Sequence, residues 1–319
     1  MIKGSALHIP ADYYDAEDSD NVCYLCENPH YSLLCEVKLY DFPFTFKKCQ
    51  CGLVKQTPMP NVKFFDWFFN SEIFFSSKKT EKSAIWGYYD FIADEACRLA
   101  TSRKRYKMLR HLFEADRPLE VMKIGPATGT FLYVVREHGH HAMGCDVSSQ
   151  FVSFAKNNYD IEIDQGRFEL ADYRNGQFDI IVLFNVIENI PNQVEFLNAI
   201  NRTLKPGGYF ILNFVDMQRN IISWMQKSKY FLYRPPVCYI YTMPVIRKVL
   251  EKFGFHILEC HRDIRYLHIE KILTLLGCKW ALPFASMLKF HRRHFPIYAY
   301  PSKIIVAKKI EPDKKKTYK

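Results

Sequence analysis

The fold of this chain is decided by the stretch Leu119-Glu-Val-Met-Lys-Ile-Gly-Pro-Ala-Thr-Gly-Thr-Phe131. It begins apolar and β-prone, breaks at Gly125, and resumes as a helix-like run from Thr130 to His138. The pattern therefore predicts a strand, a tight turn and a helix. In an open α/β sheet such a turn lies at the carboxyl edge of the strands, where ligands bind. Glycine there permits positive φ and close approach of a ligand, and the helix offers free N–H groups.

The spacing of small residues indicates which ligand this turn suits. A dinucleotide fingerprint needs small residues at its first, third and sixth positions, but the sixth position here is the β-branched Thr130. The small residues instead occupy the first, third and fifth positions, which are Gly125, Ala127 and Gly129. The turn therefore does not require a ligand with a pyrophosphate.

A carboxylate ends the second predicted strand, His141-Ala-Met-Gly-Cys-Asp146. A carboxylate at that point suits a ribose diol, because it can accept two hydrogen bonds. We therefore expect an adenosine-containing ligand. The alternative is that Asp146 only caps the helix that starts near Ser148, and the spacing alone does not separate the two interpretations.

Composition limits the classes of function. The chain has 319 residues, of which 48% are apolar, enough for one large domain with a small one or for two modest domains. The formal charge of +10 is spread along the chain, apart from a basic tail at 311–319. This balance favours an anionic small-molecule partner or an anionic membrane surface. Because no basic stripe is interleaved with aromatic residues, we expect no nucleic-acid partner.

The sequence favours a cytoplasmic location. The first twenty residues are acidic, with no apolar signal segment. The longest apolar stretch, Ile272 to Leu288, is interrupted by Lys279 and Pro283, so we do not expect it to span a membrane. Ten cysteines without a secretory signal indicate reduced thiols or metal ligands rather than disulfides.

Two cysteine pairs near the start of the chain, Cys23-Tyr-Leu-Cys26 and Cys49-Gln-Cys51, predict a metal site. The segment between them alternates and is rich in Val, Tyr and Phe, which is typical of short strands. Pairs at the tips of hairpins are the arrangement of a zinc ribbon, and four thiolates would make a closed, structural site. The second pair has a single-residue gap, which Gly52 helps by permitting the turn. The alternative is four ordinary buried thiols.

The remaining chain divides into a helical lead and an α/β region. Residues 62–117 are expected to be helical and contain a dense aromatic band, which we interpret as packing against the main domain. Predicted strands lie at 119–124, 141–145, 161–164, 178–184, 209–215, 255–260 and 303–308, and helices at 130–138, 149–158, 193–204 and 243–253. This alternation predicts a doubly wound, mostly parallel sheet. The expected division is a ribbon-like module at 1–61, a helical lead at 62–117, the ligand-binding domain at 118–310 with acceptor-side insertions at 216–241 and 262–300, and the tail at 311–319.

These motifs together resemble the class I S-adenosylmethionine (SAM)-dependent methyltransferases. The motifs that match, in the expected order, are Ile124-Gly-Pro-Ala-Thr-Gly129, Gly144-Cys-Asp146, Phe178-Asp-Ile-Ile-Val-Leu-Phe-Asn-Val-Ile-Glu-Asn-Ile-Pro191, Leu204-Lys-Pro-Gly-Gly-Tyr-Phe-Ile-Leu212 and the segment from Tyr241 to Phe255. The cysteine pairs resemble the zinc-ribbon lead of one subset of this family. The resemblance implies a seven-stranded Rossmann-like sheet with an antiparallel last pair.

The resemblance also implies a role for particular residues. The glycine turn would line the methionine part of SAM, Asp146 would hold the ribose hydroxyls, and Phe168 would lie beside the adenine. Asn185 and Val186 would border the sulfonium, and Tyr88 or Tyr89 would close the site. The turn residues in question are Gly125, Ala127 and Gly129.

Three positions depart from the family pattern. Lys123 stands where the family usually has an acidic residue beside the cofactor's ammonium, and a cation there repels the ligand unless it turns away or pairs elsewhere. Ala127 replaces the customary middle glycine, and Asn189 replaces a frequent histidine. These departures support an alternative hypothesis, a degenerate methyltransferase fold that serves as a binding or scaffold module.

The expected reaction is O- or N-methylation of a sugar, a nucleotide-sugar or a lipid-linked acceptor. Methyl transfer from a sulfonium is an in-line displacement in which orientation supplies most of the rate, so the sequence indicates the cofactor better than the acceptor and assigns no catalytic base. The segment Val237-Cys-Tyr-Ile-Tyr241 stands where sugar C-methylating relatives have a histidine–glutamate pair, which argues against a carbon acceptor. Methylation of a lipid head group by a peripheral membrane protein is a third hypothesis. The oligomeric state is not predicted.

Overall fold

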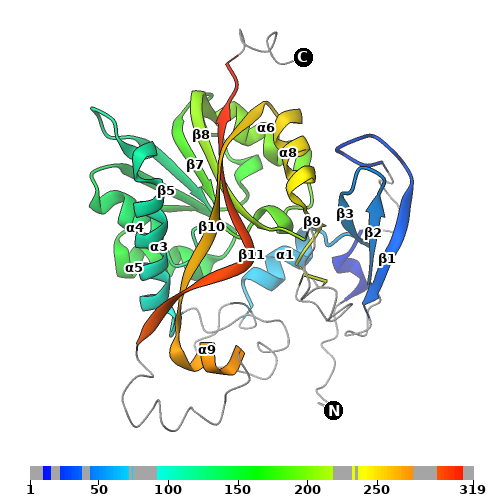
Figure 1. The fold of residues 1–319 in the computed structure, drawn as a ribbon, viewed down its shortest axis with the longest axis horizontal. Helices are drawn as coiled ribbons and strands as arrows, with labels where there is room; N and C mark the ends of the chain where they lie inside the picture. Colours follow the sequence, from blue (N-terminus) through cyan, green and yellow to red (C-terminus); the bar gives the residue numbers. More distant parts are fainter. Residues whose placement is uncertain are drawn as a thin grey trace.

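The chain is built around a seven-stranded sheet with the order β10-β11-β8-β7-β4-β5-β6 (Figure 1). The computed structural model describes residues 10–15, 22–37, 44–71, 74, 92–217, 232–233, 236–275 and 293–311. The strands of this sheet are β4 (Glu120–Ile124), β5 (His141–Asp146), β6 (Ile163–Gln165), β7 (Phe178–Leu183), β8 (Leu204–Val215), β10 (Phe255–His268) and β11 (His294–Lys309). Strands β4 to β8 pair in parallel, and β11 is antiparallel to both β8 and β10. The predicted doubly wound sheet with an antiparallel last pair is confirmed.

Helices cover both faces of this sheet because its central strands are apolar on both sides. In β7, Ile180 and Val182 pack on one face and Ile181 and Leu183 on the other. The first face is covered by α3 (Glu95–Leu109) and α4 (Thr130–Glu137), and the second by α6 (Gln193–Thr203) and α8 (Met243–Lys252). Helix α5 (Ser149–Tyr159) packs beside α4, and α9 (Ile269–Leu275) follows β10. Short 3₁₀ turns are η1 (Ala11–Tyr13), η2 (Arg110–Phe113), η3 (Phe168–Leu170) and η4 (Ile187–Asn189).

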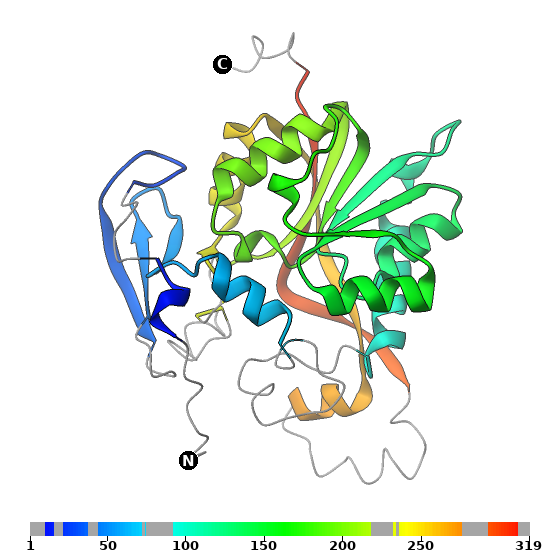
Figure 2. The ribbon, with the colours of Figure 1, turned by 180° about the vertical axis from the view of Figure 1, so that it is seen from behind.

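A second, antiparallel sheet has the order β1-β2-β3-β9. Its strands are β1 (Tyr31–Val37), β2 (Phe44–Cys49), β3 (Val54–Thr57) and β9 (Tyr239–Ile240). The last strand comes from far along the chain, and Val54 pairs with Ile240. Figures 1 and 2 show β1, β2 and β3 at one side of the molecule, with α1 between them and the large sheet.

The helical lead contains α1 (Val62–Phe69), which begins where Asn61 Oδ1 accepts the N–H of Phe64. Asparagine is a favoured residue at this position because its side chain satisfies a free helix N–H. Phe64, Phe65 and Phe68 are buried on one face of α1. Part of the aromatic band therefore packs into the core, as expected, while Phe65, Phe69 and Phe74 also line a cavity.

Three strands are longer than the sequence indicates. Strand β8 was expected at 209–215 but begins at Leu204. Strands β10 and β11 were expected at 255–260 and 303–308, but they continue as a twisted two-stranded ribbon to His268, which pairs with His294. The extension was missed because it is rich in charged residues and its pairing is interrupted by a bulge between Arg262 and Ile264. No helix among the described residues is long and apolar enough to cross a membrane.

Candidate functional site

A cavity of about 510 Å³ opens at the carboxyl ends of β4, β5 and β7, the edge at which ligands bind in sheets of this kind. Its walls include the ends of these strands, helix α1, helix α3, the turns η3 and η4, and the end of β10 with the start of α9. Leu232, Pro236 and Val237 also line it. Residues far apart in the sequence therefore meet around one space. Of the residues predicted to bind the cofactor, Gly125, Ala127, Asp146, Phe168, Asn185 and Val186 line this cavity.

The turn after β4 requires a left-handed backbone at three positions. The φ angles are +61° at Gly125, +51° at Ala127 and +84° at Gly129. A Cβ on Gly125 would lie 2.6 Å from Val186 Cγ2, so glycine also allows the loop after β7 to approach this turn. Ala127 adopts the left-handed region despite its Cβ, which costs about 1–2 kcal/mol for an L-residue.

Asp146 fixes this turn to the end of β5. Its Oδ2 accepts the N–H of Ala127 at 3.2 Å, and its Oδ1 accepts the N–H of Ser148 at 3.0 Å. Burial raises the pKa of Asp146, while these N–H groups and the nearby Lys123 oppose that shift. Each carboxylate oxygen keeps a further lone pair, so Asp146 has acceptor capacity for a ligand. The N–H of Ser148 belongs to the residue that precedes α5, so this contact is not a hydrogen bond to the first turn of the helix.

The other residues predicted to bind the cofactor differ in burial, since Phe168 is buried and Asn185 is exposed. Phe168, in η3, is 2% exposed and its ring lies 5.3 Å from that of Tyr173. Asn185 is exposed in the cavity and has a φ of +57°. Tyr88 and Tyr89 lie outside the described residues.

Lys123 is buried and pairs with the backbone of its own turn. Its Nζ donates to Gly125 O at 2.8 Å and lies 5.5 Å from the centre of the Phe184 ring. Burial, together with the charges of Arg105 and Arg98, lowers the pKa of Lys123 to about 7. This lowered pKa favours the neutral form of Lys123, which weakens the repulsion that a cation at this position would exert.

Sequence reasoning missed a buried network that forms one wall of the cavity. Asp263, on β10, is fully buried and accepts from both Nε and Nη2 of Arg105 at 3.0 and 2.9 Å. It also accepts from Arg265 Nε at 2.9 Å and from Asn213 Nδ2 at 3.1 Å. Asp263 and Arg265 lie in the part of β10 beyond the predicted strand at 255–260. The alternation Asp263-Ile-Arg265 was the one local sign, because in a strand its two polar residues share a face.

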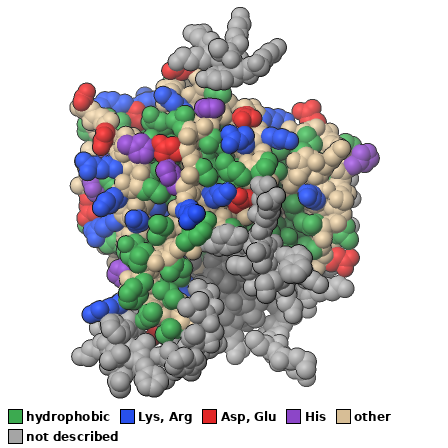
Figure 3. All heavy atoms as spheres, viewed as in Figure 1, with side chains coloured by type: hydrophobic (Ala, Val, Ile, Leu, Met, Phe, Trp, Pro, Cys, Tyr) green, Lys and Arg blue, Asp and Glu red, His purple; other side chains and the backbone are tan. Residues whose placement is uncertain are grey.

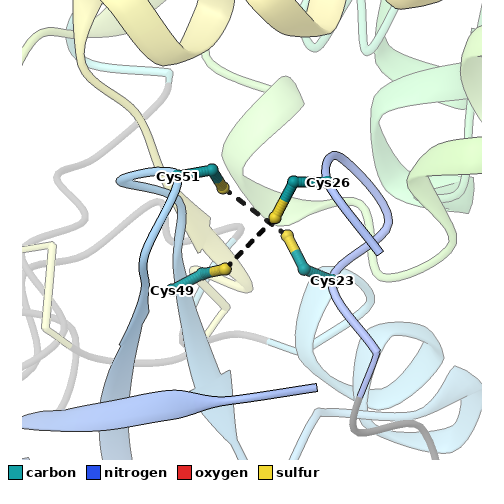
Figure 4. A group of neighbouring side chains, drawn as sticks. All are labelled: Cys23, Cys26, Cys49 and Cys51. Carbon is teal, nitrogen blue, oxygen red and sulfur yellow. Dashed lines mark hydrogen bonds between the residues drawn. The ribbon is translucent and has the colours of Figure 1, made fainter. Parts of the chain in front are cut away.

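The four predicted metal ligands come together at the end of the small sheet (Figure 4). The Sγ atoms are 3.7 Å apart for Cys23 and Cys51 and 3.4 Å apart for Cys26 and Cys49. These distances exclude disulfides, whose sulfurs are about 2.05 Å apart. A tetrahedral ion with Zn–S bonds of about 2.3 Å needs sulfurs roughly 3.8 Å apart, so the cluster has the dimensions of a four-thiolate site.

The single-residue gap of the second pair has a local cause. Cys49 ends β2, and Gly52, with a φ of +97°, donates its N–H to Cys49 O at 2.9 Å. This tight turn brings Cys51 back beside Cys49. Glycine is required here because the left-handed conformation is strained for other residues.

Residues 236–241, which we name the strap, connect the small sheet to the cavity. Cys238 donates its N–H to Glu188 O at 2.7 Å, and its own carbonyl accepts the N–H of Gln56 at 2.8 Å. The hydroxyl groups of Tyr241 and Tyr24 lie 3.1 Å apart, next to the cysteine cluster in sequence. Because the strap also contributes Val237 to the cavity wall, the two sites share one structural element.

The strand order, the glycine turn after β4 and the carboxylate at the end of β5 define a Rossmann-like methyltransferase fold. Residues 95–260, more than half of the chain, match the family model described as a methyltransferase domain. The chain belongs to this family, and its resemblance to class I SAM-dependent methyltransferases is confirmed.

Individual relatives match only part of the chain. It is 25% identical over 115 residues to ubiquinone biosynthesis O-methyltransferase from Idiomarina loihiensis, covering 33% of this chain and 45% of that protein. It is 29% identical over 109 residues to demethylmenaquinone methyltransferase from Leptospira interrogans, covering 31% and 44%. The chain thus spans less than half the length of these curated relatives. Magnesium protoporphyrin IX methyltransferase from Synechocystis, solved with bound SAH, aligns with a TM-score of 0.48 at 14% identity over 76% of this chain and 96% of that one.

Replacing Lys123 with Met should remove a pH-dependent part of the stability. The unfolded lysine binds its proton up to about pH 10.5, whereas the folded one loses it near pH 7. Because the unfolded state then binds more protons, the free energy of unfolding rises with pH across this window, by at most about 1.4 kcal/mol per pH unit. Urea unfolding at pH 7 and pH 9 should show a steeper rise in wild type than in Lys123→Met. Equal slopes would show that burial of Lys123 does not perturb its ionisation.

Ala127→Gly should stabilise the chain. Glycine removes the left-handed strain of about 1–2 kcal/mol and costs roughly 0.5–1 kcal/mol in backbone entropy, so the free energy of unfolding should rise by about 0.5–1 kcal/mol. Thermal and urea unfolding would measure this change. As a control, Ala142→Gly replaces an alanine inside β5, where φ is not positive, and should destabilise the chain. A lower free energy of unfolding in Ala127→Gly would show that the left-handed backbone at Ala127 is not strained.

Proposed function

We propose that this chain transfers a methyl group from SAM to an oxygen or nitrogen of a small-molecule acceptor, such as a sugar, a nucleotide-sugar or a lipid-linked compound. The observation that carries the proposal is the meeting of the glycine turn, Asp146 and Asn185 around one cavity, in a chain of the methyltransferase-domain family. We further propose the division into a module at 1–61, a lead at 62–117, the binding domain at 118–310 and a tail at 311–319.

The residues present fit SAM. The left-handed turn from Gly125 to Gly129 leaves no Cβ at its first position, so the methionine portion can approach the backbone there. Asp146 keeps unused lone pairs for two ribose hydroxyls. Lys123 is engaged by Gly125 O and partly neutral, so it does not exclude an ammonium group.

When bound, SAM supplies a methyl group activated by a positively charged sulfur. The chain's own contribution is to bind and orient, which is sufficient for an in-line displacement. Asn185 and Val186 lie at the end of β7, where they would border the reacting centre. Phe65, Phe69 and Phe74 form an aromatic wall that would keep water from it.

The cavity is lined by both aromatic and basic side chains, which bear on the choice of acceptor. The aromatic wall and Val237 suit an apolar or ring portion, and Arg98, Arg265 and Lys271 also line the cavity. Of these cations, Lys271 forms an ion pair with Asp94 at 3.0 Å. This arrangement supports the anionic small-molecule acceptor expected from the net charge. Much of the acceptor-side segments 216–241 and 262–300 lies outside the described residues.

We propose that the four cysteines hold one structural zinc ion. The support is their tetrahedral spacing and the absence of an open coordination position in a four-thiolate set. Cys23 and Cys49 are buried, Cys51 is half-buried and Cys26 is exposed, so the ion would lie at the edge of the core of the small sheet.

The cytoplasmic location and the absence of a nucleic-acid partner remain expectations from the sequence. On the face shown in Figure 3, Lys and Arg side chains are interspersed with Asp and Glu and form no continuous basic stripe. Peripheral contact with an anionic membrane is a weaker second candidate, favoured by the formal charge of +10. A degenerate, non-catalytic binding module is the alternative that Lys123 and Ala127 support.

Calorimetry with SAM and with S-adenosylhomocysteine (SAH) tests the cofactor. Wild type should bind both, and Asp146→Ala should bind roughly 10–100-fold more weakly, because hydrogen bonds to a charged group contribute about 1.5–3 kcal/mol each. Asp164→Ala is a matched control, since Asp164 lies on the neighbouring β6 and does not line the cavity. A folded wild-type chain that binds neither compound would overturn the proposal and favour the binding module.

Metal analysis tests the zinc site. Purified wild type should contain about one zinc per chain, and Cys26→Ser should lose it because a four-thiolate site tolerates no missing ligand. Cys35→Ser is the control, since Cys35 lies on β1 outside the cluster. The small sheet is hydrogen-bonded through the strap to the rest of the chain. Loss of the ion from this sheet should therefore also lower the unfolding temperature of Cys26→Ser. A metal-free wild type that melts at the same temperature as Cys26→Ser would contradict a structural ion.

A further inference from the structure

The wall formed by Asp263 carries more positive than negative charge. Two guanidinium groups, those of Arg105 and Arg265, share this single buried carboxylate. Arg105 is satisfied by it on two nitrogens and is only 10% exposed, but Arg265 donates to it through Nε alone and is 32% exposed in the cavity. Arg265 is therefore the member of the pair that offers its charge to a ligand.

Arg265 also fixes the orientation of Asn185. Its Nη2 donates to Asn185 Oδ1 at 2.7 Å, and Asn213 Nδ2 donates to the same oxygen at 3.2 Å. A guanidinium can only donate, so the atom of Asn185 that faces it must be the oxygen. The NH₂ group of Asn185 is thus directed away from both donors.

Unused donors remain on both residues. Within the part of the chain that the structure describes, no hydrogen bond engages Arg265 Nη1 or Asn185 Nδ2. Both residues line the cavity, and Asn185 is exposed there. Two neighbouring donors, one of them charged, are the groups that recognise a carboxylate.

We propose that Arg265 and Asn185 form a carboxylate-binding subsite, and that the methyl acceptor is an organic acid with an aromatic or apolar body. One carboxylate oxygen would accept from Arg265 Nη1 and the other from Asn185 Nδ2. The body would face the aromatic wall formed by Phe65, Phe69 and Phe74. The assignment of the acceptor rests on the proposed function, whereas the subsite itself rests only on the geometry.

The probe is 4-fluorobenzoate, with neutral 4-fluorobenzamide as its matched control, titrated by ¹⁹F NMR in the presence of saturating SAH. We expect saturable binding of the benzoate and at least about tenfold weaker binding of the benzamide, since the charged hydrogen bonds are lost. Arg265→Met and Asn185→Gly should each weaken benzoate binding about tenfold or more. Glycine is chosen at 185 because it tolerates the φ of +57°.

Arg262→Met is the control variant, because Arg262 is exposed on the same strand and stacks on Tyr298 instead of lining the cavity. It should leave benzoate binding unchanged. If Arg265→Met does not fold, Arg265→Lys and Asn185→Gly test the subsite. Arg265→Lys keeps a cation beside Asp263, and Asn185→Gly leaves the contacts of Asp263 unchanged. Equal binding of benzoate and benzamide, or unchanged benzoate binding in the subsite variants, would overturn the proposal.

A further arm separates the acceptor from the cofactor's own carboxylate. If Arg265→Met weakens SAH binding and 4-fluorobenzoate competes with SAH, the subsite belongs to the cofactor and the proposal is wrong. If wild type does not bind SAH, the proposed function fails, and the same titrations without SAH still decide whether the subsite exists.

Discussion

The cavity depends on one buried carboxylate, that of Asp263. Burial alone would raise its pKa, but the charges of Arg105 and Arg265 outweigh this and hold the pKa well below its usual range. Through these contacts Asp263 joins α3 to β10, and through Asn213 and Ser302 it joins β8 and β11. Removing one member of such a buried pair typically costs about 3–5 kcal/mol, because the remaining charge is left without a partner. The position of Asn185, and with it the edge of β7, follows from this set of contacts.

The turn after β4, also at the cavity, is held by side-chain hydrogen bonds to its backbone. Asp146 accepts the N–H groups of Ala127 and Ser148, so the end of β5 fixes both the turn after β4 and the start of α5. Lys123 completes the turn by donating to Gly125 O, which a carboxylate at that position could not do. The departure from the family pattern is therefore accommodated by a local hydrogen bond, without disturbance of the strand that carries it.

Much of the fold could be predicted from the sequence because its strands are short apolar runs separated by glycine and proline. The four clustered cysteines were equally predictable, since their spacing is local. The buried network around Asp263 was not predictable from the sequence. Its partner Arg105 is 158 residues away, and neither residue has a local pattern that requires the other. Strand β9 was missed for a similar reason: two residues are too few for a period, and only their partner β3 makes them a strand. The roles expected of Phe168, Asn185 and Val186 remain predictions, although these residues do line one cavity.

The pairing of β3 with β9 has a consequence for the order in which the chain is made. Val54 on β3 pairs with Ile240, which is synthesised more than 180 residues later, so this edge of the small sheet is covered only after that point. The four cysteines, by contrast, are synthesised within the first sixth of the chain and need only each other. During translation, therefore, a nascent β1–β2–β3 sheet presents an unpaired edge strand, which is the kind of surface that recruits other chains. The strap, which contains the strand that covers this edge, also supplies Val237 to the cavity wall, so one late segment completes both the small sheet and the cavity.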